Sequence, residues 1–229
     1  MSSLTRSQGI TERMNYRRDV RKMNKPGIAW MSVGACALGL GLSWTQLYAA
    51  PSAGRRITSK SVGPVRLGMT VAAARKALKG FTLERASDGD GAALIAVVRG
   101  KNSPMSLYAG EDDASAPIHE KAVIEFIEVT DRDYATKAGV HPGMSLKEAA
   151  RIYGKVKEIE MSEIEAREYA TFSREPAGLT FRVRAASGVA GLYPPEKAGD
   201  PSASRHASKY APDARIYSIG VSIGFQKSR

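Results

Sequence analysis

The pattern of apolar and polar positions predicts two short helices that begin alike. Residues 68–70 and 143–145 read Gly-Met followed by Thr or Ser, and apolar residues then recur at helical spacing. The hydroxyl groups of Thr70 and Ser145 suit the N-cap of a helix, where they accept a hydrogen bond from a backbone N–H that lacks a partner. Glu148, three residues after Ser145, completes a capping box. Helices this short need a sheet to pack against.

Each predicted helix is followed by four segments with the composition of β-strands. The segments are rich in Val, Ile, Phe, Tyr and Thr and are separated by turn residues. The first set covers residues 81–86, 93–99, 105–109 and 122–130, and the second set covers 156–161, 168–173, 179–184 and 215–223. Most connections are short, which favours antiparallel pairing.

We therefore predict an α+β fold made of two tandem repeats, each a short helix plus a four-stranded antiparallel sheet. The repeats would cover residues 60–135 and 136–226, and the two sheets could join into one curved sheet. The second repeat contains a long connection, residues 185–214, with four prolines and three glycines. A connection of this length is disordered, serves binding, or holds a short element that the pattern does not reveal.

The first fifty residues have the features of a signal peptide rather than of a folded domain. Residues 23–25 begin a short basic region, residues 28–44 carry no charge, and residues 47–51 offer small side chains for cleavage. The stretch 1–22 carries further basic residues, so Met23 could be the true start and 1–22 an overcalled extension.

Two other interpretations of this leader stay open. Residues 33–36, Val-Gly-Ala-Cys, resemble a lipobox in which Cys36 would be acylated, although the apolar run continues past the cysteine. The apolar segment could also remain as an uncleaved helix, but at about 1.5 Å per residue it is short for a hydrocarbon layer of about 30 Å. We predict an exported protein of the periplasm of a Gram-negative bacterium, or alternatively an outer-membrane lipoprotein.

Charge and cysteine content narrow the possible functions. The formal net charge is +11, but residues 51–229 carry 27 Lys and Arg against 21 Asp and Glu, so much of the excess belongs to the leader. The remaining basic residues are dispersed, which argues against a nucleic-acid partner. Cys36 is the only cysteine, so the chain forms no internal disulfide and no cysteine-based zinc site. We predict membrane contact only through the leader or a lipid on Cys36.

The best candidate binding residues lie on two predicted strands near the C-terminus. Alternation places Arg182 and Arg184 on one face of their strand, and Arg215 and Tyr217 on one face of theirs. If the strands are neighbours, these side chains make a basic and aromatic patch of a kind enriched at protein interfaces. An ordinary solvent-exposed face explains the same pattern.

The sequence offers little catalytic chemistry. Residues 51–229 contain no metalloprotease, phosphate-binding or dinucleotide-binding motif, and we predict no catalytic residues, no metal site and no cofactor. Glu125 and Glu128 are three residues apart on a predicted strand, which places them on opposite faces. His141, beside Pro142, carries an imidazole group of the kind that serves as a general acid or base. A hydrolase without a recognisable motif remains an alternative, and loss of activity in His141 or Glu125 variants that still fold would favour it.

The paired Gly-Met-Thr and Gly-Met-Ser segments, each before a short helix and antiparallel strands, resemble the repeat of beta-lactamase inhibitor proteins. They are also similar to the unit of small outer-membrane assembly lipoproteins. The segments Gly-Pro-Val at 63–65, Ala-Gly-Val-His-Pro-Gly at 138–143 and Ile-Tyr-Ser at 216–218 resemble an uncharacterised family of envelope-stress lipoproteins. The chain departs from the inhibitors because it lacks their disulfides. The resemblance implies an exported protein-binding or envelope-maintenance module without a cofactor.

Taken together, these features predict a non-enzymatic periplasmic module that recognises a protein or an envelope component. The alternative is an outer-membrane lipoprotein, acylated at Cys36, with an envelope-maintenance role.

Overall fold

A computed structural model describes residues 52–89, 91–162, 166–186, 188–194 and 205–222 of the chain. These residues all belong to one compact unit, residues 46–229. The predicted signal peptide, Cys36 and residues 195–204 of the long connection lie outside the described residues. Among the helices that are described, none has the length and apolar character needed to cross a membrane.

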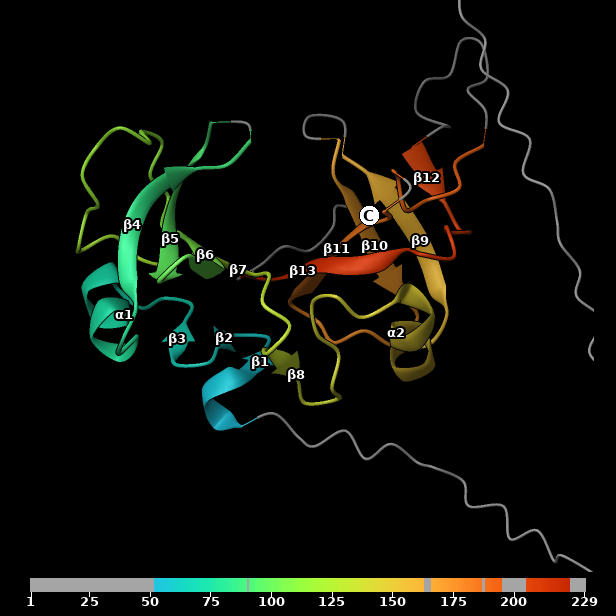
Figure 1. The fold of residues 1–229 in the computed structure, drawn as a ribbon, viewed down its shortest axis with the longest axis horizontal. Coiled ribbons are helices and arrows are strands. Elements are labelled where there is room, and N and C mark those ends of the chain that lie inside the picture. The colour runs from blue at the N-terminus through green and yellow to red at the C-terminus, as the bar shows by residue number, and fades with distance from the viewer. Residues whose placement is uncertain (1–51, 90, 163–165, 187, 195–204, 223–229) are drawn as a thin grey trace, which may run out of the picture. The chain divides into compact units, whose positions relative to one another are not determined.

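The larger of two sheets is antiparallel throughout and has nine strands (Figure 1). Across the sheet, the strands are β12 (His206–Ala207), β9 (Val156–Met161), β10 (Glu168–Phe172), β11 (Leu179–Arg184), β13 (Arg215–Ser222), β7 (Phe126–Val129), β6 (Asn102–Tyr108), β5 (Ala93–Arg99) and β4 (Thr82–Ser87). Strand β13 is central because it pairs with β11 on one side and with β7 on the other.

A smaller sheet forms from short segments near the start and the middle of the described chain. Its order is β3 (Val65–Arg66), β2 (Ser61–Val62), β1 (Arg56–Thr58) and β8 (Ala135–Thr136), and a 3-10 turn, Ala53–Arg55, precedes β1. Strand β8 runs parallel to β1, whereas the other pairs are antiparallel.

The two helices begin where the sequence predicts. Helix α1 (Val71–Ala77) is capped by Thr70, whose hydroxyl accepts a hydrogen bond from the backbone N–H of Ala73. Helix α2 (Leu146–Tyr153) is capped by Ser145, and Glu148 closes the predicted capping box by accepting a bond from the Ser145 N–H. The local hydroxyl chemistry was therefore enough to place both helix starts.

The segments before the two helices are held by matching backbone bonds. In each, the glycine N–H donates to the carbonyl oxygen of a residue far along the chain, and the N–H of that residue donates to the methionine carbonyl. The first helical residue donates to the carbonyl oxygen two positions earlier in the same distant segment. The bonds run from Gly68 to Ile124, Ile124 to Met69 and Val71 to Ala122, and from Gly143 to Ile216, Ile216 to Met144 and Leu146 to Ala214. These bonds hold the start of α1 against residues 122–124, which lead into β7, and the start of α2 against residues 214–216, where β13 begins.

The core lies between the helices and one face of the large sheet. Val71 and Ala74 of α1, and Leu146 and Ala149 of α2, are fully buried. Aromatic rings complete the packing under α2, where Tyr153 contacts Phe172 and Phe181 with ring centroids 6.1 and 5.7 Å apart. Alternate residues of the large sheet, among them Glu128, Arg182 and Arg184, point to the opposite face, which we call the open face.

The predicted fold class, an α+β protein made of two helix-plus-four-strand repeats, is wrong. The described chain is mostly β-structure, with two short helices and separate sheets of nine and four strands. The sequence pattern missed the small sheet because its strands are only two or three residues long, too short to show alternation. It also missed β12, which lies within the long connection and forms an edge of the large sheet.

Candidate functional site

A β-bulge shapes the open face at the centre of the large sheet. Arg182 of β11 pairs with Ser218 of β13, but the next residue, Val183, pairs with Ile216. Tyr217 is therefore the extra residue on β13, and the bulge turns both Tyr217 and Ser218 toward the open face. Bulges re-aim side chains in this way next to functional sites.

Two arginines contact the Tyr217 ring. The guanidinium carbon of Arg182 lies 4.7 Å from the ring centroid, and that of Arg184 lies 4.3 Å from it. A cation this close to an aromatic ring is attracted by the ring quadrupole. Tyr217 thus positions both guanidinium groups, and we call Arg182, Arg184 and Tyr217 the arginine–tyrosine cluster.

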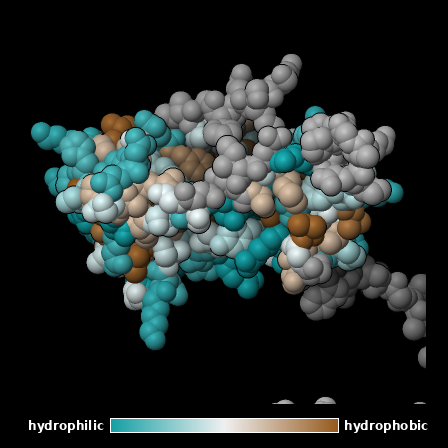
Figure 2. Space-filling model, turned by 90° about the horizontal axis from the view of Figure 1, so that it is seen from above, coloured by the Kyte–Doolittle hydropathy of each residue, from teal (hydrophilic) through white to brown (hydrophobic). Residues whose placement is uncertain are grey.

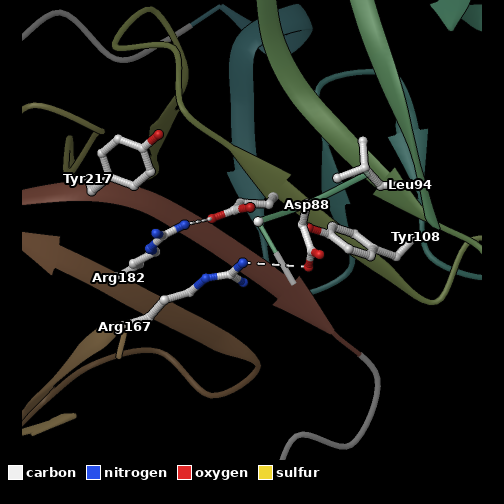
Figure 3. Close-up of a pocket in the computed structure, with 8 residues that line it drawn as sticks. Asp88, Leu94, Tyr108, Arg167, Arg182 and Tyr217 are labelled. Carbon is white, nitrogen blue, oxygen red and sulfur yellow. Dashed lines mark ion pairs between the residues drawn. The ribbon is translucent and has the colours of Figure 1, made fainter. Parts of the chain in front are cut away.

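Two carboxylates balance part of this charge. The guanidinium group of Arg182 lies 3.7 Å from Glu128 of β7, which also accepts a 2.5 Å hydrogen bond from the Ser218 hydroxyl. Arg167, which precedes β10, lies 3.5 Å from Asp88, which follows β4. These ion pairs are drawn as dashed lines in Figure 3 and join residues from distant parts of the chain.

These side chains line a groove on the open face, made of two adjoining hollows. The first has a volume of about 480 Å³ and the second about 250 Å³, and Arg167, Arg182 and Tyr217 line both. The first hollow is completed by Asp88, Gly89, Leu94, Tyr108 and Glu128, and the second by Ala166, Glu168, Val183, Arg184, Gly188 and Val189. Figure 3 labels Asp88, Leu94 and Tyr108 in the first hollow. The first hollow is within the size range of ligand sites.

A buried carboxylate holds one wall of the groove. Glu168 is 5% exposed, and its oxygens accept hydrogen bonds from the backbone N–H groups of Ala190 and Gly191 and from the Tyr193 hydroxyl. Burial, together with the bond to Glu168, raises the pKa of Tyr193. These bonds fix residues 188–194, part of the connection that we expected to be disordered, to serve binding, or to hold a short element.

The structure brings together three of the four predicted binding residues. Arg182, Arg184 and Tyr217 form the arginine–tyrosine cluster. Arg215 shares their strand pair, but its guanidinium group donates to the carbonyl oxygen of Gly143 and does not line the groove. The predicted alternation along β11 is correct, because Arg182 and Arg184 point away from the core while Val183 is buried.

The sequence missed the residues that complete the groove. Asp88, Tyr108, Glu128 and Arg167 lie in segments that are far apart in the sequence, and the strand pairing of the large sheet brings these segments together. The alternation of β7 contained a usable indication for Glu128, since it placed this residue opposite the buried Ile127 and Val129. No pattern among the residues near Arg167 in the sequence predicted that its side chain lines the groove.

Two histidines, His141 and His206, lie apart from the groove. His141 holds its own loop through a 2.7 Å contact between Nδ1 and the Pro142 carbonyl oxygen. His206 pairs with Glu158. Among the residues that the structure describes, no three His, Asp or Glu side chains converge as metal ligands would.

The arrangement is suited to binding. Ser218 is 1% exposed, and its hydroxyl donates a hydrogen bond to Glu128. Paired guanidinium groups on a tyrosine offer planar donors to a carboxylate or phosphate and a flat surface to an aromatic or apolar group.

No family model and no curated protein matches this chain. Among solved structures, the chain is similar to the uncharacterised protein YfeY from Escherichia coli, with 14% sequence identity and a TM-score of 0.45. The match covers 73% of this chain and 99% of YfeY.

Proposed function

We propose that this protein is an exported, non-enzymatic binding module of the periplasm of a Gram-negative bacterium. It recognises a protein or an envelope component with the groove on the open face. The observation that carries this proposal is the contact of Arg182 and Arg184 with one ring, that of Tyr217, inside a groove. Tyr and Arg are the residues that most often dominate binding energy at interfaces.

The position of the groove supports this role. The helices and the core occupy one face of the large sheet, so the open face can contact a partner without disturbing the packing. One wall of the groove, residues 188–194, is held by hydrogen bonds to Glu168, and this fixed position lowers the entropy cost of binding. Among the coloured atoms of Figure 2, hydrophilic and intermediate residues predominate over separate hydrophobic patches. The groove itself is lined by charged side chains, so polar and charged contacts would set specificity.

A cross-linking pull-down from the native envelope tests the proposal. We expect the double variant Arg182→Ala with Tyr217→Ala to recover much less partner than the unmodified protein, because it removes the centre of the arginine–tyrosine cluster. Arg66→Ala, on the small sheet, is the matched control and should recover the normal amount. Unchanged recovery by the double variant, with the fold intact by circular dichroism, would remove the groove from consideration.

The mature N-terminus decides how the module is held in the envelope. Mass spectrometry of the protein purified from its host should find an N-terminus near Ala50 for a free periplasmic protein. A lipid-modified Cys36 at the N-terminus would instead establish the outer-membrane lipoprotein.

A further inference from the structure

Arg184 lines the groove, and it forms no ion pair with the described residues of the chain. Its side chain is exposed and lies 4.3 Å from the Tyr217 ring, and among the described residues no carboxylate approaches it within salt-bridge distance. Arg182, by contrast, faces Glu128 at 3.7 Å. The second hollow is therefore the end of the groove with an excess of positive charge.

The arginine–tyrosine cluster is arranged to receive an anion. Two guanidinium groups, 4.7 and 4.3 Å from one ring centroid, concentrate positive charge beside the second hollow, and a negative group there is attracted by both. Guanidinium groups also offer paired N–H donors in a planar fork, which matches the two oxygens of a carboxylate. Because Tyr217 already orients both arginines, little side-chain entropy remains to be lost on binding.

An apolar side chain lies beside this anion site. Val189 lines the second hollow and is 52% exposed, and Leu192, three residues later, is 55% exposed. Both belong to the segment that Glu168 fixes through the N–H groups of Ala190 and Gly191. The second hollow thus offers a cationic contact and an apolar contact on a rigid support.

We propose that the groove binds an acidic peptide segment of a partner protein. The carboxylate of an Asp or Glu would pair with Arg184 in the second hollow, and a neighbouring apolar residue of the segment would cover Val189. This inference rests on the proposed binding function and specifies the chemistry of the partner.

The first hollow favours a peptide over an anionic membrane surface. Asp88 and Glu128 line it and would repel a layer of phosphate groups, whereas a peptide can place a donor or a basic residue beside them. The alternation of charge along the groove, from these carboxylates to Arg184, matches a partner that carries different groups at successive positions.

Selection from a random 12-residue peptide display library on the immobilised full chain tests the proposal. We expect the selected peptides to be enriched in Asp and Glu next to apolar or aromatic residues. The same selection on Arg184→Gln should lose that enrichment, and selection on Arg66→Gln should keep it. Selected peptides without acidic enrichment, or with equal enrichment on Arg184→Gln, would overturn the proposal.

Affinity measurements on the best selected peptide provide the second test. Replacing its Asp and Glu by Asn and Gln, or Arg184 by Gln, should weaken binding by about tenfold, because each change removes a charge-assisted contact. Arg66→Gln should leave the affinity unchanged. Binding to phosphatidylglycerol vesicles that Arg184→Gln abolishes, together with no such effect on the peptides, would assign the site to membrane lipid and reject an acidic peptide.

The two proposals fail in different ways. If the pull-down depends on Arg182 and Tyr217 but the peptides show no acidic preference, the groove binds a partner of other chemistry and only this inference is lost. If the pull-down is unaffected by the double variant, the proposed function is lost as well.

Discussion

A single arginine organises the loop beside the edge strand β4. The Arg85 guanidinium group donates two hydrogen bonds to Glu111, at 2.6 and 2.9 Å, and further bonds to the carbonyl oxygens of Ala116 and Pro117. The Glu111 carboxylate also accepts from the backbone N–H of His119. Glu111 therefore closes the loop between residues 111 and 119.

This pair makes stability depend on pH. The hydrogen bonds from Arg85 hold the pKa of Glu111 below its usual value, so the carboxylate stabilises the folded state above the unfolded pKa of about 4.3. That contribution is lost as the pH falls through the lower, folded pKa. Urea unfolding between pH 7 and pH 3 should show an acid-side loss of stability that is smaller in Glu111→Gln, whereas Asp112→Asn should behave like the unmodified protein. Parallel profiles for the unmodified protein and Glu111→Gln would contradict the assignment.

At the scale of elements, the centre of the large sheet depends on a glycine in β13. Gly220 pairs with Thr180 of β11 on one side and Glu128 of β7 on the other. A Cβ atom at this position would lie 2.7 Å from the Phe126 ring and would also meet the Thr180 hydroxyl. The glycine therefore makes room for side chains from both neighbouring strands.

Adding a methyl group at Gly220 should weaken the sheet. We expect Gly220→Ala to lower the free energy of unfolding by about 1 to 3 kcal/mol, the usual cost of overpacking. Gly89→Ala is the control, since nothing lies within 4 Å of its added Cβ atom. Denaturant titration measures both, and equal stability of the two variants would show that the strands move apart without cost.

At the scale of the described molecule, the pairing of β13 with β7 joins two sets of strands into one sheet. Strands β4 to β7 come before residue 135 in the chain, and strands β9 to β13 come after it. Four residue pairs join β13 and β7, from Ile219 with Val129 to Ser222 with Phe126. The buried apolar residues on both sides of this junction belong to one continuous core. The groove exists only because of this junction, since its two arginine–carboxylate ion pairs cross it.

The continuous sheet should make unfolding a single event. In a urea titration of the full chain followed by hydrogen exchange, amides of β5 and β11 should lose protection at the same concentration, because neither strand can unfold without exposing the shared core. Two separate transitions would show that the parts on each side of the β7–β13 pair are stable alone.

The candidate site was predictable only in part. Alternation along β11 was enough to place Arg182 and Arg184 on one face, because a strand fixes side-chain direction locally. The same rule could not separate Arg215 from Tyr217, since both lie on one face of β13 and only the contact with Gly143 takes Arg215 out of the groove. The bulge that aims Tyr217 is set by pairing between strands, which alternation does not reveal.

By itself, the sequence determined the features that depend on near neighbours along the chain: the N-caps at Thr70 and Ser145, the capping box of Glu148, and the buried and open faces of β11. Only the tertiary structure decided how the strands pair, that very short segments form a second sheet, and that Arg167 and Asp88 meet beside Tyr217. The reason is physical, because capping and alternation act within a few residues, whereas sheet order depends on packing between residues far apart in the sequence.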